Sequence, residues 1–221
     1  MTTLFEVDRT CAVCGQESRQ LSLTSTSSFG APDLDLRPAP LARYSLGQEV
    51  EACPYCGYCA QDISRVTVRA RRAVSSAAYK ADLERESFPE LTRHFLCAAR
   101  TLSASRRPVD AGWAALKGAW AADDEENDEA ARHCRELAAG NFLRARRNRH
   151  TFVKEIGGEE ALLADLHRRA GDFEGAAAVA QEGISRGAEG FLRDILLFQI
   201  RLAGLGDSGC HSVAEAEGDK V

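Results

Sequence analysis

The stretch Cys53-Pro54-Tyr55-Cys56-Gly57 repeats a pattern that occurs near the start of the chain as Cys11-Ala12-Val13-Cys14-Gly15. In each stretch two thiols are separated by two residues and followed by glycine, a residue that tight turns favour. Two such turns, called knuckles below, can bring four thiolates together, and four cysteine sulfurs are a preferred ligand set of structural Zn²⁺. The sequence therefore predicts a zinc site made of Cys11, Cys14, Cys53 and Cys56.

Four thiols have other chemical uses, which the sequence leaves open. Iron in a four-thiolate cage is the main alternative metal, and redox disulfides are the alternative without a metal. The first residues contain no basic segment followed by an apolar run, so we expect no secretory signal and a cytoplasmic location, where disulfides are rare. Cys59 gives the second knuckle the spacing of an iron–sulfur run, but a small buried residue in the first turn after the knuckle is the simpler interpretation.

The hydrophobic pattern changes near residue 60. Before it, Leu21–Thr24 and Tyr44–Leu46 alternate in polarity and predict brief strands, among most of the prolines of the chain. After it, apolar residues follow helical spacing between turn signals. We expect three parts: a zinc-ribbon domain over residues 1–59 with each knuckle at the tip of a hairpin, a helical domain over residues 60–205, and a flexible tail over residues 206–221.

The predicted fold class is mainly α, with a small N-terminal zinc ribbon followed by antiparallel helices of tetratricopeptide-like packing. The helices are expected to start near Pro89 and Pro108 and to cover residues 127–156, 159–170, 174–185 and 191–205. Gly171-Asp172-Phe173, with small residues on both sides, is typical of the turn in a tetratricopeptide unit. A plain helical bundle is the alternative, because one clear unit is fewer than the three that stabilise a solenoid.

A resemblance rests on two motifs, Phe29–Pro38 with its Asp33-Leu34-Asp35-Leu36-Arg37 core, and Cys53–Tyr58. They resemble the bacterial family called domain of unknown function 2225, in which a Cys-x2-Cys opens the chain and a Cys-Pro-x-Cys-Gly-Tyr knuckle introduces helices. The resemblance continues in Leu166–Phe173 and covers most of the chain. It implies a zinc ribbon with helical repeats and implies no activity. Cys59 departs from the family pattern, which more often has alanine or another small residue there.

The long segment between the knuckles contains the best recognition residues, because a long ordered loop is often functional. Asp33, Asp35 and Arg37 stand there between Pro32 and Pro38. Alternating carboxylates of this kind could bind a cation or an arginine-rich surface of a partner. The structural alternative is that both carboxylates cap turns or pair with the basic helix around residues 65–72.

Two groups of arginines form a predicted basic patch. On a helix, Arg65, Arg69 and Arg72 would share one face, and a second group contains Arg144 and Arg147. Such a stripe can bind phosphates. The net charge of −5 and the lack of interleaved aromatic residues do not favour nucleic acid, however, so a solvated helix face is the simpler interpretation.

The sequence contains no His-Glu-x2-His, no Gly-x-Ser-x-Gly and no phosphate-binding glycine loop. It also contains no apolar run of the length that a membrane span needs. Its high alanine and arginine content suits a high-GC bacterial coding sequence. We therefore expect a zinc-stabilised protein that binds another protein. Nucleic-acid binding is the alternative, and an enzyme with a site between ribbon and helices is a weaker one.

Overall fold

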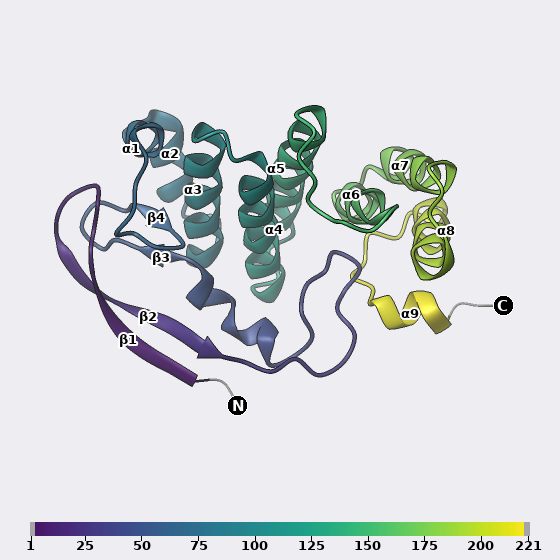
Figure 1. Cartoon of the computed structure of the whole chain (residues 1–221), viewed down its shortest axis with the longest axis horizontal. Helices are drawn as coiled ribbons and strands as arrows, with labels where there is room; N and C mark the ends of the chain where they lie inside the picture. Colours follow the sequence, from purple (N-terminus) through teal and green to yellow (C-terminus); the bar gives the residue numbers. More distant parts are fainter. Residues whose placement is uncertain (1–2, 219–221) are drawn as a thin grey trace. The chain divides into compact units, whose positions relative to one another are not determined.

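The structure is a computed structural model that describes residues 3–218, and these residues form two compact units (Figure 1). Unit 1 consists of Met1–Ser28 and Pro40–Asn141, and unit 2 consists of Phe29–Ala39 and Phe142–Val221. The predicted fold class is confirmed: the chain is mainly α, with two small antiparallel hairpins near its N-terminus. Unit 1 continues across residue 59, and the segment between the knuckles contributes to both units.

Both knuckles lie at hairpin turns of unit 1. Strand β1 (Thr3–Thr10) pairs antiparallel with β2 (Glu17–Ser25), and the first knuckle connects them. Strand β3 (Glu51–Ala52) pairs antiparallel with β4 (Cys59–Ala60), and the second knuckle connects those. The prediction that each knuckle occupies the tip of a hairpin is therefore confirmed.

The strand predicted at Tyr44–Leu46 is wrong, because these residues belong to η1, a 3-10 helix over Ala42–Glu49. The Ser45 hydroxyl donates a hydrogen bond of 2.7 Å to the Ala42 carbonyl. A local bond of this kind offers the backbone an alternative to a strand ladder. The alternating pattern alone could not distinguish the two outcomes, since Leu46 is buried in either case.

The helices of unit 1 begin where side chains or prolines satisfy their first turns. Thr67 caps α1 and Ser76 caps α2 through side-chain oxygens that accept backbone N–H groups, while Pro108 opens α4. The bounds are Val68–Val74 for α1, Ala77–Leu83 for α2, Glu90–Ala104 for α3, Pro108–Asp124 for α4 and Asp128–Arg147 for α5. The starts predicted near Pro89 and Pro108 are confirmed.

Helix α5 ends at Arg147, nine residues before the predicted end at residue 156. Arg149 has a φ of 60°, and the His150 N–H donates to the Ala145 carbonyl over 3.0 Å, which closes the helix C-terminus. Phe152 then stacks on Phe142, with ring centroids 4.5 Å apart. This aromatic contact needs the chain to turn back, so tertiary packing outweighs the helical pattern here.

Unit 2 is built from three packed helices and one short helix. The bounds are Gly158–Arg169 for α6, Phe173–Ser185 for α7, Gly190–Gly204 for α8 and Val213–Gly218 for α9. These agree with the predicted helices to within one residue, while α9 lies in the predicted flexible tail. That part of the prediction is wrong, since Ala216 is buried in the apolar core of unit 2. Residues 219–221 of the predicted tail lie outside the described residues.

In the part of the chain that the structure describes, no helix combines the length and the apolar character that crossing a membrane requires.

Helices α6, α7 and α8 pack closely at Gly183 of α7, where there is no room for a larger side chain. A Cβ atom there would lie 2.8 Å from Glu160 Cβ in α6 and 2.9 Å from Leu196 Cδ1 in α8. We expect Gly183→Ala to lower the free energy of unfolding of unit 2 by about 1–3 kcal/mol, because the neighbours must move. Gly204→Ala is the matched control: it would meet no atom within 4 Å, so greater helix propensity should raise stability by up to about 1 kcal/mol. Urea unfolding followed by circular dichroism compares them, and equal stabilities would contradict the packing.

Candidate metal centre

The two knuckles share one backbone geometry. Gly15 donates its N–H to the Cys11 carbonyl over 2.8 Å, and Gly57 donates its N–H to the Cys53 carbonyl over 2.9 Å. Both glycines have left-handed backbones, with φ of 77° for Gly15 and 69° for Gly57. Glycine is the residue that adopts this conformation without strain. The glycine after each cysteine pair is therefore what lets the turn close.

The four predicted ligands converge. Cys11 Sγ lies 3.7 Å from Cys56 Sγ, and Cys14 Sγ lies 3.6 Å from Cys53 Sγ. All four sulfurs lie within 4.8 Å of one another. A tetrahedral Zn²⁺ with Zn–S bonds of about 2.3 Å separates its sulfurs by about 3.8 Å. The donor set and its spacing thus fit a metal ion, and these four cysteines could hold one.

The surroundings affect the four thiols unequally. Burial raises the pKa of the Cys53 and Cys56 thiols, whereas the backbone hydrogen bond at Gln16 lowers the pKa of Cys14. A metal binds thiolates, so its binding would release protons from the thiols that burial keeps neutral. The affinity for a metal should therefore decrease as the pH is lowered.

Arg71 holds the first knuckle from outside the cluster. This residue of α1 donates to the carbonyl of Val13 over 2.9 Å and also to the carbonyl of Ala12. The Ala12 N–H donates to the Ile63 carbonyl over 2.9 Å, which ties the same knuckle to the segment after the second one. No local pattern in the sequence indicates this role, because Arg71 stands among other arginines and its partners lie far away in the chain.

Cys59 lies outside the four-sulfur group. Its thiol donates to the Gly57 carbonyl over 3.3 Å, and its backbone N–H donates to the Tyr79 hydroxyl over 2.9 Å. The residue is completely buried, which agrees with its interpretation as a small residue packed behind the knuckle. Cys97 and Cys134 are also buried in helices, and Cys210 is exposed.

The predicted recognition residues of the inter-knuckle segment are buried. Asp33, Asp35 and Arg37 have exposed fractions of 7%, 0% and 5%. Asp35 accepts a hydrogen bond of 3.2 Å from Arg169 of α6 through Oδ2, and one of 3.1 Å from the Arg37 N–H through Oδ1. The hydrogen bonds of the buried Asp35 therefore hold this loop within unit 2. Asp35 pairs with Arg169 and not with the basic residues 65–72 that the structural alternative named.

Leu36 has an unusual backbone conformation within this loop. Its φ of 66° is a left-handed backbone that costs a leucine about 1–2 kcal/mol. The Leu36 N–H donates to the Asp33 carbonyl over 2.9 Å, and the Asp33 N–H donates to the Arg37 carbonyl over 3.0 Å. These bonds close a tight turn, and together with the buried Asp35 they hold the strained residue in place.

The inter-knuckle segment pairs with the end of the chain. We call residues 29–39 together with residues 207–216 the clasp. The Leu34 N–H donates to the His211 carbonyl over 2.9 Å, and the Leu34 side chain, 4% exposed, belongs to the apolar core of unit 2. The segment that separates the two halves of the metal cluster in sequence is thus a structural part of unit 2.

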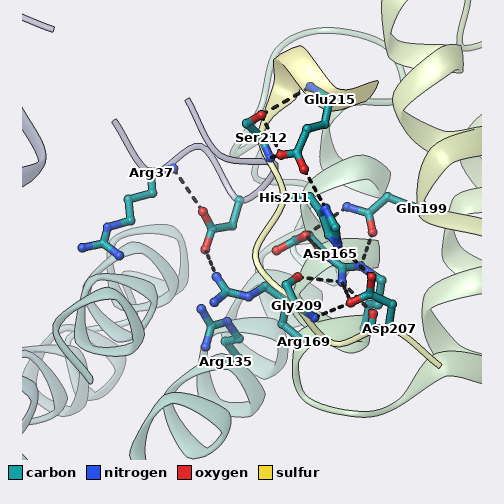
Figure 2. A network of polar contacts seen from close by, with 12 residues as sticks. Arg37, Arg135, Asp165, Arg169, Gln199, Asp207, Gly209, His211, Ser212 and Glu215 are labelled. Carbon is teal, nitrogen blue, oxygen red and sulfur yellow. Dashed lines mark hydrogen bonds and ion pairs between the residues drawn. The ribbon is translucent and has the colours of Figure 1, made fainter. Parts of the chain in front are cut away.

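Arg168 anchors the C-terminal half of the clasp. This completely buried residue of α6 donates to Asp165 over 2.7 Å and to Gln199 over 2.7 Å. Its remaining nitrogen donates to the carbonyls of Asp207 and Gly209 over 2.7 and 2.8 Å. Figure 2 shows Asp165, Gln199, Asp207 and Gly209 close together. A buried guanidinium with all these acceptors fixes the path of the tail.

His211 lies between two carboxylates in the same segment (Figure 2). Its Nε2 is 2.9 Å from Asp207 Oδ2 and its Nδ1 is 3.1 Å from Glu215 Oε1. The ring also packs edge-on against Phe198, with centroids 5.7 Å apart. The clasp therefore combines backbone pairing, an apolar contact and a cluster of charges.

The predicted basic patch is dispersed. Thr67 is the N-cap of α1, so Arg65 precedes the helix and does not share a face with Arg69 and Arg72 as expected. Arg65 instead pairs with Asp62 over 3.2 Å. The other four predicted residues are exposed: Arg69, Arg72, Arg144 and Arg147.

Comparison with models of protein families, with curated proteins and with solved structures found no match for this chain. The resemblance to the domain of unknown function 2225 thus rests on the motifs quoted above.

Metal removal should loosen the clasp, although the clasp belongs to the other unit. Both ends of the segment that carries residues 29–39 are fixed by the knuckles, and freeing those ends raises the entropy that docking must overcome. We expect faster hydrogen exchange at the Leu34 and Val213 amides after chelation of the metal. The amide of Ala180 in α7 is the control and should change little. Unchanged exchange at Leu34, with faster exchange at the knuckles, would contradict the coupling.

The clasp should also weaken in acid. Backbone hydrogen bonds from Gly209 and Ser212, together with His211, lower the pKa values of the Asp207 and Glu215 carboxyls. A carboxyl with a lowered folded-state pKa stabilises the fold above its unfolded value, about 4, and this contribution is lost as the pH falls through the folded pKa. The stability difference between wild type and Asp207→Asn in urea should therefore be largest at neutral pH and shrink below pH of about 4. A difference independent of pH would exclude this contribution.

Proposed function

We propose that this chain is a protein-interaction module whose four knuckle cysteines hold a structural Zn²⁺. The observation that carries the proposal is the spacing of the four sulfurs, which matches a tetrahedral site with every position taken by cysteine. A site with four protein ligands leaves no position for a substrate or a reactive water. The metal would then stabilise the shape of the protein, and the surrounding surfaces would bind the partner.

The fold supports this role for the metal. The β1–β2 and β3–β4 hairpins each have two strands, and such hairpins are marginal in water on their own. A metal shared by their turns would join them to each other. The proposal implies a reducing compartment such as the cytoplasm, where the thiolates stay available.

A protein partner is favoured over nucleic acid by the charges and by the exposed apolar residues. The net charge is −5. Arg65 precedes α1 and does not share a helix face with Arg69 and Arg72, so the predicted arginine stripe is not formed. Leu4, Phe5 and Leu21 of the first hairpin are 44%, 45% and 51% exposed. The register pairs Glu6 with Leu21, so Leu4 and Leu21 share one face of the hairpin and Phe5 lies on the other. Neighbouring exposed apolar side chains such as Leu4 and Leu21 are typical of protein-binding surfaces. The packed helices α6, α7 and α8, with the Gly171-Asp172-Phe173 turn, support a tetratricopeptide-like arrangement of the kind that binds proteins.

The metal assignment is tested by elemental analysis of the purified protein. We expect one Zn²⁺ per chain, loss of that zinc in Cys11→Ser, and a lower melting temperature of this variant, because a site with three thiolates binds more weakly. Cys210→Ser is the matched control, since Cys210 is an exposed cysteine outside the cluster, and it should keep its zinc. Iron in place of zinc, or no stoichiometric metal, would overturn the assignment.

The binding class is tested on heparin and on duplex DNA at increasing salt. An interaction module should elute at low salt, and the triple variant Arg65→Gln, Arg69→Gln, Arg72→Gln should behave like wild type. Retention that decreases steeply with salt, and that the triple variant loses, would instead establish nucleic-acid binding and would refute the proposed function.

A further inference from the structure

Strand β1 forms an open edge of the first hairpin. This sheet has two strands, so in the described part of the chain β1 pairs with β2 on one side and with no strand on the other. Strand β2 packs beside η1, and Figure 1 shows the hairpin with β1 on its outer side. The edge of a strand is a row of N–H and C=O groups, and its natural complement is another strand.

The register identifies the backbone groups on this edge. The Cys11 N–H donates to the Gln16 carbonyl, directly beyond the last paired residues of β1 and β2. Hydrogen-bonded and non-hydrogen-bonded pairs alternate along an antiparallel ladder. Val7, an even number of residues before Cys11, therefore bonds to β2. Glu6 and Asp8, on either side of Val7, present their N–H and C=O groups to the outer edge.

The second hairpin follows the same alternation. There the Cys53 N–H donates to the Tyr58 carbonyl over 2.9 Å. The next residue, Cys59, directs its N–H away from β3 and donates to the Tyr79 hydroxyl over 2.9 Å. The outward group of that hairpin thus has a partner within the protein. Among the described residues, no hydrogen bond to another segment uses the backbone of Glu6 or Asp8.

The exposed face beside this edge is acidic. Glu6 and Asp8 share it with Glu17 of β2, because side chains alternate between the faces of a strand. The base on this face is Arg19, which lies 3.2 Å from Glu6 and 3.7 Å from Asp8. One guanidinium therefore serves two carboxylates, and three acids face one base. Exposed ion pairs of this kind are weak, so the face retains a negative charge that a basic strand would complement.

A second copy of this chain does not fit the edge. Two copies related by a two-fold axis perpendicular to the sheet would pair their β1 strands antiparallel, and the outward groups of one strand must meet those of the other. The registers that pair the middle of the strand then place Glu6 opposite Glu6, Glu6 opposite Asp8, or Asp8 opposite Asp8. Like charges directly opposite each other destabilise a ladder. The charges of β1 therefore disfavour pairing with itself.

We propose that the outer edge of β1 binds an extended strand of a partner protein, with lysine or arginine opposite Glu6 and Asp8 and an apolar residue opposite Leu4. This inference rests on the proposed function, whose partner class it makes specific. In strand addition, main-chain hydrogen bonds supply affinity and alternate side chains supply specificity. The basic side chains would neutralise the charge that Arg19 leaves, and the apolar side chain would cover the exposed Leu4.

The test uses the full-length, zinc-loaded protein and the fluorescein-labelled peptide Thr-Lys-Thr-Lys-Thr-Val-Thr. In antiparallel register its two lysines lie opposite Asp8 and Glu6, and its valine lies opposite Leu4. We expect saturable binding in fluorescence anisotropy. N-methylation of the second lysine removes a hydrogen bond to β1 and should weaken binding by about tenfold or more. N-methylation of the threonine between the lysines is the matched control, because its N–H points away from β1, and it should change binding little.

Charge reversal on the protein gives an independent readout. Glu6→Lys combined with Asp8→Lys should weaken binding of the lysine peptide by about tenfold or more. The same variant should gain binding of a peptide with glutamate in place of both lysines, which keeps the test decisive if the variant is less stable. Glu129→Lys combined with Glu136→Lys, at exposed positions of α5, makes the same change in net charge and should bind the lysine peptide like wild type.

Hydrogen exchange locates the bound strand. The amides of Glu6 and Asp8 should become protected when the peptide binds, whereas the Val7 amide already bonds to β2 and should change little. The proposal is overturned if the peptide does not bind, if both N-methylated peptides bind equally well, or if protection appears away from β1. Protection of the Glu6 and Asp8 amides that increases with protein concentration, without peptide, would assign the edge to a second copy and would also overturn it.

Each of these results leaves the zinc and heparin tests of the proposed function unaffected. Failure of the strand edge and failure of the interaction module are therefore distinguishable.

Discussion

Everything in the N-terminal part of this protein depends on four sulfurs meeting at one point. Each of the two hairpins that carry them has only two strands, and a two-stranded hairpin is marginally stable on its own in water. Left-handed glycines shape each knuckle, and Arg71 and the Ala12–Ile63 backbone bond hold the first knuckle beside the second. The backbone of the knuckles therefore orients the four cysteines, and a metal ion would bind ligands that are already in position.

The same cage has a second consequence, because its ligands bracket a segment that belongs to the other unit. Asp35 is completely buried in an ion pair with Arg169. A buried ion pair adds little net stability, since desolvation offsets most of the attraction, but an alternative position of the loop would leave one charge buried without its partner. The pair therefore specifies where the loop docks more than it strengthens the docking.

Local sequence signals predicted the features that local chemistry determines. The knuckles, the starts of α3 and α4 and the turn before α7 follow from cysteine spacing, prolines and the Asp172 cap, each of which acts within a few residues. The remaining features depend on contacts between distant residues. The end of α5 is set by the Phe142–Phe152 stack, the role of Arg71 by carbonyls of the first knuckle, and the path of the tail by Arg168. Asp35 was predicted to be a surface recognition residue because its partner, Arg169, lies 134 residues further along the chain.

The division of unit 2 between residues 29–39 and the C-terminal part of the chain bears on how the protein folds during synthesis. A ribosome adds about 5–20 residues per second, so roughly 10–35 s separate the emergence of Leu34 from that of His211. During this interval both knuckles are complete, and the cysteines can capture a metal before the C-terminal helices exist. Until then residues 29–39 form a loop tethered between the knuckles, with Leu34 exposed to water. Unit 2 cannot finish folding until residues 207–216 have left the ribosome, and a fragment that begins at residue 142 would lack Leu34 of the apolar core.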